Sequence, residues 1–352
     1  MLLPGIGEEG QRRIASSSVL IVGCGALGCV AADSLARAGV GRLTLIDRDV
    51  VEITNLQRQI LYTEQDAREG TPKAQAAASR LRAVNSQITI DPVVADLNAR
   101  NVESLVSAAT VVVDATDNFQ TRYLLNDACV KLARPLVYGG VVGTSGMTMT
   151  IWVPPRSAWR SNLPTPCLRC IFPEPPPPGS SPTCDTAGVL GPMVSVVASI
   201  QVAEALKVLL GRDDLLRPVL SQFDIWNNQR HTIDLSMIDR SNCVCCAKRQ
   251  FEFLEGDRSD PGTTTLCGTD SVQVLPDASE HRFDLPALAA RLSAHGAFTT
   301  TPHFLRGRFS SERNRASDNP IELTVFPDGR AIVKGTTDPA IARSIYARYI
   351  GT

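Results

Sequence analysis

The sequence predicts an α/β fold, with a mostly parallel sheet, an antiparallel extension and a small C-terminal α+β module. Two observations carry this prediction. Short apolar runs alternate with helical segments in the first half, as parallel strands joined by crossover helices do. After Val141 several strand-like runs follow one another instead. A length of 352 residues with 43% apolar residues fits about two globular domains.

The elements of the first half follow from apolar periodicity and from glycine boundaries. In chain order we expect a strand at Ser18–Gly23, a helix at Leu27–Ala38, a strand at Arg42–Asp47, a helix at Lys73–Val84, an extended run at Gln87–Val94, a strand at Thr110–Asp114, a helix at Phe119–Leu132 and a strand at Pro135–Gly139.

The second half is expected to extend the sheet and then to start a new module. Strands are expected at Met147–Val153, Val219–Phe223 and His231–Leu235, and a long helix at Pro192–Leu210. The predicted domains are residues 1–254, a linker at 255–265 and an α+β module at 266–352. Within the module we expect a strand near Val272, a helix at Leu285–Ser293, extended segments in Thr299–Phe309, a hairpin at Glu322–Val333 and a closing helix at Pro339–Tyr349.

Composition and charge exclude several classes of protein. The formal net charge of −1 offers no broad electrostatic surface for nucleic acid or anionic lipid. The N-terminal residues lack the layout of a secretory signal. The apolar stretch Gly188–Ala203 is too short to span a bilayer. We therefore expect a cytoplasmic protein without a nucleic-acid or membrane partner.

A glycine-rich turn predicts a nucleotide site. Gly23, Gly25 and Gly28 have the spacing G-x-G-x-x-G and lie between an expected strand and an expected helix. The N–H groups at the start of that helix can bind a phosphate, and Asp47 ends the next strand, where a carboxylate can accept ribose hydroxyls. Taken alone, these residues also fit a nicotinamide dinucleotide, which would make the protein an oxidoreductase.

Charged residues nearby favour phosphoryl chemistry over hydride transfer. Arg58, Lys73 and Arg122 are cations that can neutralise a triphosphate, and the segment Asp114–Asn118 supplies carboxylates for Mg²⁺. Each charge by itself is typical of a solvated surface. Together, the three cations and Asp114, Asp117 and Asn118 form a set beside the glycine-rich turn. This set indicates a nucleoside triphosphate.

Four cysteines predict a structural zinc site. Cys167 and Cys170 form one Cys-x-x-Cys pair, and Cys243 and Cys246 form a second pair, with 72 intervening residues between the pairs. Four thiolates complete a tetrahedral site without an open coordination position. The two Cys-x-x-Cys pairs, or knuckles, are therefore expected to hold a structural zinc ion that stabilises the fold. Redox-active pairs are the alternative, and Cys245 could compete with Cys246 as a ligand.

Taken together, the motifs resemble the ThiF/MoeB/HesA family, the bacterial relatives of ubiquitin-activating enzymes. The resemblance covers about residues 1–250 and rests on GCGALG, IDRDVVEITNLQRQ, GTPKA, DATDNFQTRYLLND and TAGVLGPMVSVVASIQVAEALKVLLG. It implies a Rossmann-like sheet and an enzyme that binds MgATP and adenylates the C-terminal glycine of a ubiquitin-like sulfur-carrier protein. It also implies Asp117 as the Mg²⁺ ligand, the four paired cysteines as zinc ligands, and ATP contacts from Gly25, Asp47, Asp49, Asn55, Arg58 and Lys73. The predicted nucleotide site further includes Gly23, Gly28, Gln59, Asp114, Asn118 and Arg122.

This chemistry needs no general base, because an α-carboxylate is already ionised at neutral pH. Arg58, Lys73 and the Mg²⁺ on Asp117 would offset the charge that builds up as two anions meet. Cys184 precedes the long expected helix, where some relatives carry a cysteine that attacks the adenylate or forms a persulfide linkage. A covalent role for Cys184 and a spectator thiol both remain open.

The sequence departs from the family in two places. Members usually begin with a helix whose arginine reaches the ATP of the partner subunit in a homodimer, whereas this chain begins MLLPGIGEEGQ. A late start codon, an internal methionine or an arginine supplied otherwise would each account for this. The C-terminal module lacks the cysteine loop of a rhodanese, so a ubiquitin-like or carrier-docking module is the expectation from topology.

The predicted partners are a sulfur carrier ending in Gly-Gly, a second copy of the chain and a sulfur donor such as a cysteine desulfurase. Adenylation of a small molecule or a tRNA base is the alternative activity, and a non-catalytic carrier-binding scaffold is the alternative class. The sequence leaves the pathway open among thiamine, molybdenum cofactor, tRNA thiolation and amino-acid biosynthesis.

Overall fold

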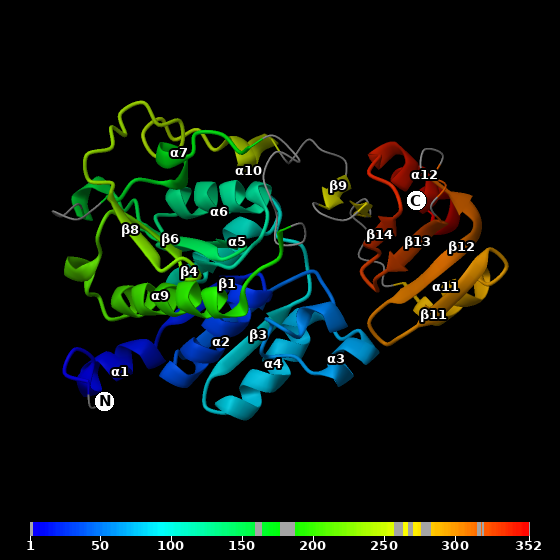
Figure 1. The fold of residues 1–352 in the computed structure, drawn as a ribbon, viewed down its shortest axis with the longest axis horizontal. Coiled ribbons are helices and arrows are strands. Elements are labelled where there is room, and N and C mark those ends of the chain that lie inside the picture. Colours follow the sequence, from blue (N-terminus) through cyan, green and yellow to red (C-terminus); the bar gives the residue numbers. More distant parts are fainter. Residues whose placement is uncertain are drawn as a thin grey trace. The chain divides into compact units, whose positions relative to one another are not determined.

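A computed structural model of the chain contains two compact units, Met1–Arg258 and Ser259–Thr352 (Figure 1). The division falls between the predicted boundaries at residues 254 and 266. Each unit is described by itself. The structure describes residues 3–158, 164–176, 187–256, 263–266, 270–275, 283–314, 318 and 320–351.

The first unit is built on an eight-stranded sheet of order β3-β2-β1-β4-β5-β6-β7-β8. The strands β3 to β5 pair in parallel, and β6, β7 and β8 extend the sheet as antiparallel neighbours. The predicted fold class is confirmed. The strands are β1 (Ser18–Val22), β2 (Arg42–Ile46), β3 (Thr89–Val93), β4 (Val111–Asp114), β5 (Leu136–Val142), β6 (Ser145–Ile151), β7 (Val219–Asp224) and β8 (Gln229–Asp234).

Helices cover the two faces of this sheet and form two cores. Side chains of α2 (Ala26–Ala38), α4 (Lys73–Val84) and α9 (Gly191–Leu209) pack with Ile21 and Val113 on one face. Side chains of α5 (Val102–Ser107) and α6 (Phe119–Lys131) pack with Leu20 and Val112 on the other. The two faces alternate along β1 and β4, as side chains of a strand do. The other helices among the described residues of this unit are α1 (Gly7–Ala15), α3 (Glu64–Glu69), α7 (Leu168–Ile171) and α10 (Glu252–Gly256), with short 3₁₀ turns η1 (Ile53–Asn55), η2 (Arg156–Ala158) and η3 (Asp213–Leu215).

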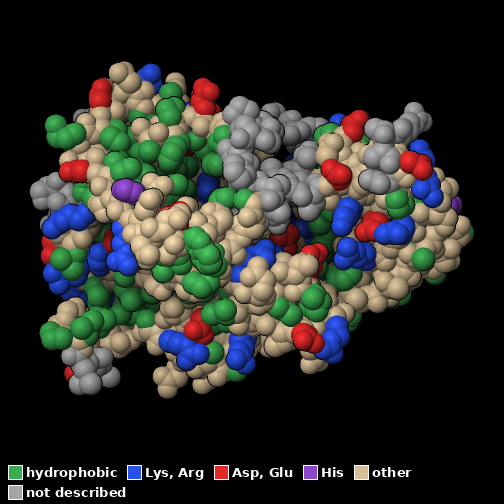
Figure 2. All heavy atoms as spheres, in the orientation of Figure 1, with side chains coloured by type: hydrophobic (Ala, Val, Ile, Leu, Met, Phe, Trp, Pro, Cys, Tyr) green, Lys and Arg blue, Asp and Glu red, His purple; other side chains and the backbone are tan. Residues whose placement is uncertain are grey.

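One described helix, α9, is long and apolar enough to cross a membrane by length and composition alone. Half of its most apolar window is buried in the protein, where Met193, Val197 and Ala198 are in the core. Packing against the sheet therefore accounts for its composition. On the visible face of the molecule, basic side chains lie interspersed with acidic ones, in keeping with the near-neutral net charge (Figure 2).

The second unit is a six-stranded antiparallel sheet of order β11-β12-β13-β14-β10-β9 with two helices. The hairpin at Pro327-Asp328-Gly329 joins β13 to β14, where Gly329 adopts φ +84°. The expected linker 255–265 contains most of β9, because three consecutive β-branched threonines extend along β10. The elements are β9 (Thr263–Leu266), β10 (Ser271–Val274), α11 (Leu285–Leu292), β11 (Gly296–Thr300), β12 (Leu305–Arg313), β13 (Pro320–Val325), β14 (Ala331–Lys334) and α12 (Pro339–Tyr349).

Candidate nucleotide site and metal centre

The glycine-rich turn connects β1 to α2 at the carboxyl edge of the parallel strands. Gly23 has φ +92°, and a Cβ atom on Gly28 would lie 1.9 Å from the carbonyl oxygen of Gly23. Both positions therefore require glycine. Gly25 precedes α2 as its N-cap without a side-chain cap, and a Cβ atom there would meet nothing closer than Gln59 Nε2 at 3.9 Å. The backbone at the start of α2 thus has room beside Gly25, as the close approach of an anion to a helix start requires.

Asp47 ties the end of β2 to this turn. Its Oδ2 accepts a hydrogen bond of 2.6 Å from the backbone N–H of Cys24, and its Oδ1 accepts one of 2.7 Å from Asp49 N–H. Burial raises the pKa of Asp47, although the ammonium of Lys73 opposes the shift. A carboxylate has about four acceptor positions. The two contacts leave capacity for hydroxyl donors such as those of a ribose.

Lys73 begins α4 and lies against the same carboxylates. Its Nζ is 3.1 Å from Asp49 Oδ2, and its side chain is largely buried. Burial lowers the pKa of Lys73, but Asp49 and Asp47 outweigh this effect and raise the pKa above its ordinary value. The lysine therefore carries its charge at neutral pH, next to the glycine-rich turn.

Three more predicted residues lie in the segment that begins at the end of η1. Asn55 accepts a 3.3 Å hydrogen bond from Glu52 N–H, and half-buried Arg58 donates to the carbonyl of Thr54 at 3.2 Å. Gln59 is buried, and its Oε1 has no hydrogen-bond partner within the described structure. Because buried acceptors in proteins are normally hydrogen-bonded, Gln59 Oε1 could accept a hydrogen bond from a nucleotide bound near Gly25.

The segment Asp114–Asn118 divides the predicted residues into an inner and an outer group. Asp114 is 1% exposed and lies 3.5 Å from Arg122 Nε, and Arg122 also donates to the carbonyl oxygens of Thr116 and Gly139 at 2.6 and 3.0 Å. Asn118 caps α6, and Asp117 is exposed at the edge. The structure thus brings Asp117 to the open edge, while Asp114 and Arg122 lie beneath the loop.

Sequence analysis did not single out the ion pair between Arg48 and Asp96. Arg48 Nη1 lies 3.0 Å from Asp96 Oδ1, and these residues follow β2 and β3 at the same carboxyl edge. Burial lowers the pKa of Arg48, but surrounding carboxylates, Asp96 first, raise it overall. The rule that carboxyl ends of parallel strands meet at one edge would have indicated both residues.

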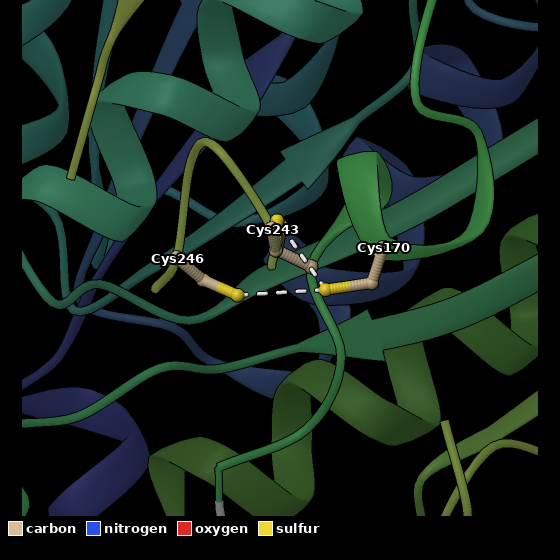
Figure 3. A group of neighbouring side chains, drawn as sticks. Cys170, Cys243 and Cys246 are labelled. Atoms are coloured by element: carbon tan, nitrogen blue, oxygen red, sulfur yellow. Dashed lines mark hydrogen bonds between the residues drawn. The ribbon is translucent and has the colours of Figure 1, made fainter. Parts of the chain in front are cut away.

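Three sulfur–sulfur distances describe a compact cluster of the four paired cysteines (Figure 3). Cys167 Sγ lies 3.7 Å from Cys170 Sγ and 3.6 Å from Cys243 Sγ, and Cys170 Sγ lies 3.4 Å from Cys246 Sγ. Zinc bonds of about 2.3 Å place tetrahedral sulfur atoms about 3.8 Å apart. The donor set could therefore hold a metal ion of that size and preference.

Cys245 is buried outside this group of four. Its Sγ accepts a 3.3 Å contact from Asn126 Nδ2 of α6, and Asn126 Oδ1 accepts a 2.9 Å hydrogen bond from Leu168 N–H. One asparagine thus binds both knuckles to α6. Cys184 lies outside the described residues.

A comparison with protein families finds a match to the ThiF family over residues 1–245. The chain belongs to the ThiF family. The predicted resemblance is therefore confirmed. Among curated ThiF relatives, the sulfur carrier protein ThiS adenylyltransferase of Bacillus subtilis (strain 168) is 40% identical over 347 residues, which cover 98% of this chain and 96% of that protein.

Two further comparisons bear on the breadth of the ThiF match. The SAMP-activating enzyme E1 of Haloferax volcanii is 40% identical over 255 residues, 72% of this chain and 89% of that protein. A crystal structure of E. coli MccB with MccA-N7isoASN has a TM-score of 0.57 and 23% identity, and it covers 67% of this chain and 68% of that one. The structural likeness supports the fold alone.

Proposed function

We propose that this ThiF-family protein is an ATP-dependent adenylyltransferase for the C-terminal glycine of a ubiquitin-like sulfur carrier. The observation that carries the proposal is the 40% identity, over 98% of this chain, with a protein named a ThiS adenylyltransferase. The site supports it, because the open start of α2 lies beside a buried, charged lysine and an exposed carboxylate. We place this reaction in the cytoplasm.

In the proposed reaction, a carboxylate oxygen of the carrier forms a bond to the α-phosphorus of ATP. The bond from that phosphorus to the bridging oxygen breaks, and pyrophosphate leaves with the electron pair. The carrier supplies an ionised nucleophile, so the enzyme has no proton to remove. Its task is to hold two anions together, for which Lys73 and Arg58 supply positive charge.

The nucleotide would lie along the carboxyl edge of the parallel strands. We assign the phosphates of the nucleotide to the turn at Gly25 and its ribose to Asp47. A donor group of the nucleotide would supply the missing hydrogen bond to buried Gln59 Oε1. Asp117 would hold Mg²⁺, since an exposed carboxylate at this edge suits a hard cation. When bound, Mg²⁺ neutralises charge on the triphosphate.

The cysteine cluster would hold a structural zinc ion. Four thiolates leave no coordination position for a substrate, so the metal would act by joining the two knuckles. Asn126 would orient the site, because it contacts backbone or sulfur atoms next to the ligands on both knuckles.

The proposed partners are a carrier with a Gly-Gly tail, a second copy of the chain and a sulfur donor. Glycines suit a tail that must pass a narrow route beside the nucleotide. Cys184 is proposed to take part in sulfur transfer after adenylation. Adenylation and sulfur transfer measured separately for Cys184→Ser decide this point, and unchanged sulfur transfer contradicts the covalent role.

Exchange of labelled pyrophosphate into ATP tests the proposed function. The purified chain is mixed with small ubiquitin-like proteins encoded near its gene, each compared with a version that lacks the terminal glycine. We expect exchange only with an intact Gly-Gly tail. Tight binding of a nicotinamide dinucleotide together with indifference to ATP would refute the proposal.

A further inference from the structure

Two adjacent glycines in β5 make room for two long polar side chains. A Cβ atom on Gly139 would lie 2.5 Å from Cδ of Gln201, which comes from α9 on one face of the sheet. A Cβ atom on Gly140 would lie 3.0 Å from Oη of Tyr138 and 3.3 Å from Nη1 of Arg122, which comes from α6. Since neighbouring residues of a strand point to opposite faces, the two glycines admit one side chain from each side.

Gln201 occupies the position where two parallel strands separate. The pairing of β4 with β5 ends at Val113 and Val137. Just beyond, Gln201 Nε2 donates hydrogen bonds of 2.7 Å to the carbonyl oxygen of Asp114 and 3.1 Å to that of Val137. The two N–H groups of one side-chain amide thus bridge the separated strand ends. The side chain is 0% exposed, so water does not replace this bridge.

The opposite face holds the same loop through Arg122. Its guanidinium donates to the carbonyl oxygen of Thr116, and it pairs with Asp114. Asp114 Oδ1 in turn accepts hydrogen bonds of 2.9 and 2.7 Å from the N–H and hydroxyl of Thr116. The loop that carries Asp117 is therefore fixed from α9 at Asp114 and from α6 at Thr116.

We propose that Gln201 is a positioning residue for nucleotide activation: its amide holds the carboxyl end of β4 and so places Asp117 for Mg²⁺. This inference rests on the proposed function. Gln201 touches no reacting atom, because it lies beneath the loop. Its contribution is to restrict where the exposed carboxylate of Asp117 can lie before ATP and Mg²⁺ arrive.

Gln201→Met tests the proposal, because methionine keeps the length of the side chain and removes both donors. In the ligand-free protein we expect the backbone amides of residues 115–117 to exchange hydrogen about tenfold faster, the factor that corresponds to the loss of one hydrogen bond. We also expect calorimetry to show an about tenfold rise in the Mg²⁺ concentration that gives half of the Mg²⁺-dependent gain in ATP affinity, while the affinity for metal-free ATP stays unchanged.

Gln11→Met is the matched control. Gln11 Nε2 donates a 2.8 Å hydrogen bond to the carbonyl oxygen of Ala38, at the far end of α2 from the nucleotide turn. Its loss removes a side-chain amide of the same size, and we expect neither readout to change. Wild-type exchange and wild-type Mg²⁺ dependence in Gln201→Met would overturn the proposal.

Gly139→Ala is a second variant, which keeps the glutamine and displaces its amide. We expect the same faster exchange at residues 115–117. If both variants fail to fold, Gln201 stabilises the fold and has no separate role in positioning Asp117. That outcome overturns the proposal. Absence of pyrophosphate exchange in the wild type with every carrier would refute the proposed function, whereas hydrogen exchange and calorimetry would still test Gln201.

Discussion

Replacing Arg122 with methionine is expected to destabilise the first unit rather than to weaken ATP binding directly. Arg122 is 9% exposed, Asp114 is 1% exposed, and their charged groups lie 3.5 Å apart. Loss of one partner from a buried ion pair costs about 3–5 kcal/mol, because the other charge stays buried. Two carbonyl oxygens, those of Thr116 and Gly139, also lose their donor.

This cost is a large part of the roughly 5–15 kcal/mol that stabilises a typical domain. At about 2–4 °C per kcal/mol for a unit of this size, the midpoint of thermal unfolding should fall by about 6–20 °C. Circular dichroism during heating measures the shift. Arg37→Met is the control, since Arg37 pairs with Asp33 on the surface of α2 at 2.8 Å and such pairs contribute about 0–1 kcal/mol.

The pH dependence of the Arg122→Met variant provides a second check. Burial raises the pKa of Asp114, and Arg122 opposes that rise. Without Arg122 the folded-state pKa rises further above the unfolded value of about 3.9, so the folded protein binds more protons than the unfolded chain. Stability of the variant should therefore be retained below that unfolded value and be lost as the pH rises toward the folded value.

Adding Asp114→Asn to Arg122→Met should recover part of the lost stability, because the amide oxygen can still accept from Thr116 without a buried charge. The reasoning would be refuted if Arg122→Met unfolded at the same temperature as Arg37→Met and differed only in a raised KM for ATP. Arg122 would then be a nucleotide ligand.

Three further predictions concern Asp117, the glycine-rich turn and the zinc site. Asp117→Ala should abolish ATP–pyrophosphate exchange at an unchanged unfolding temperature, because Asp117 is exposed; an active, folded variant refutes its assignment. Gly28→Ala should lose ATP binding in calorimetry, since its Cβ would lie 1.9 Å from a carbonyl oxygen; wild-type affinity would contradict the tight turn. Cys243→Ser should lose bound zinc in elemental analysis and unfold at a lower temperature, whereas unchanged stability without zinc would exclude a structural metal.

The sequence predicted the centre of the sheet well because β1 and β4 are buried on both faces. Buried strands appear as continuous apolar runs, such as β4, and a glycine marks the end of α2, where Gly39 has φ +81°. The short helices α3 and α5 were not predicted. Six residues are too few for apolar periodicity, and α3 is defined by its cap at Thr63.

The candidate site could be predicted only in part, because motifs identify residues but not the direction of their side chains. The glycine-rich turn lies between a strand and a helix, as its spacing indicated, and Lys73 begins α4. Arg122 has the same charge as Arg58 and lies in an equally distinctive motif, yet it points into the protein. Gln201 could not be found, because its partners are backbone carbonyls about 60 to 90 positions earlier in the chain.

The arrangement of the two cores explains why the nucleotide edge depends on residues so distant in sequence. The core under α9 and the core under α6 are separated by the sheet itself. Gln201 and Arg122 reach from these two cores to the carbonyl oxygens of Asp114 and Thr116, which lie two positions apart in one loop. A disturbance of the packing on either face can therefore move the loop that carries Asp117, so the geometry of the site is set by both cores at once.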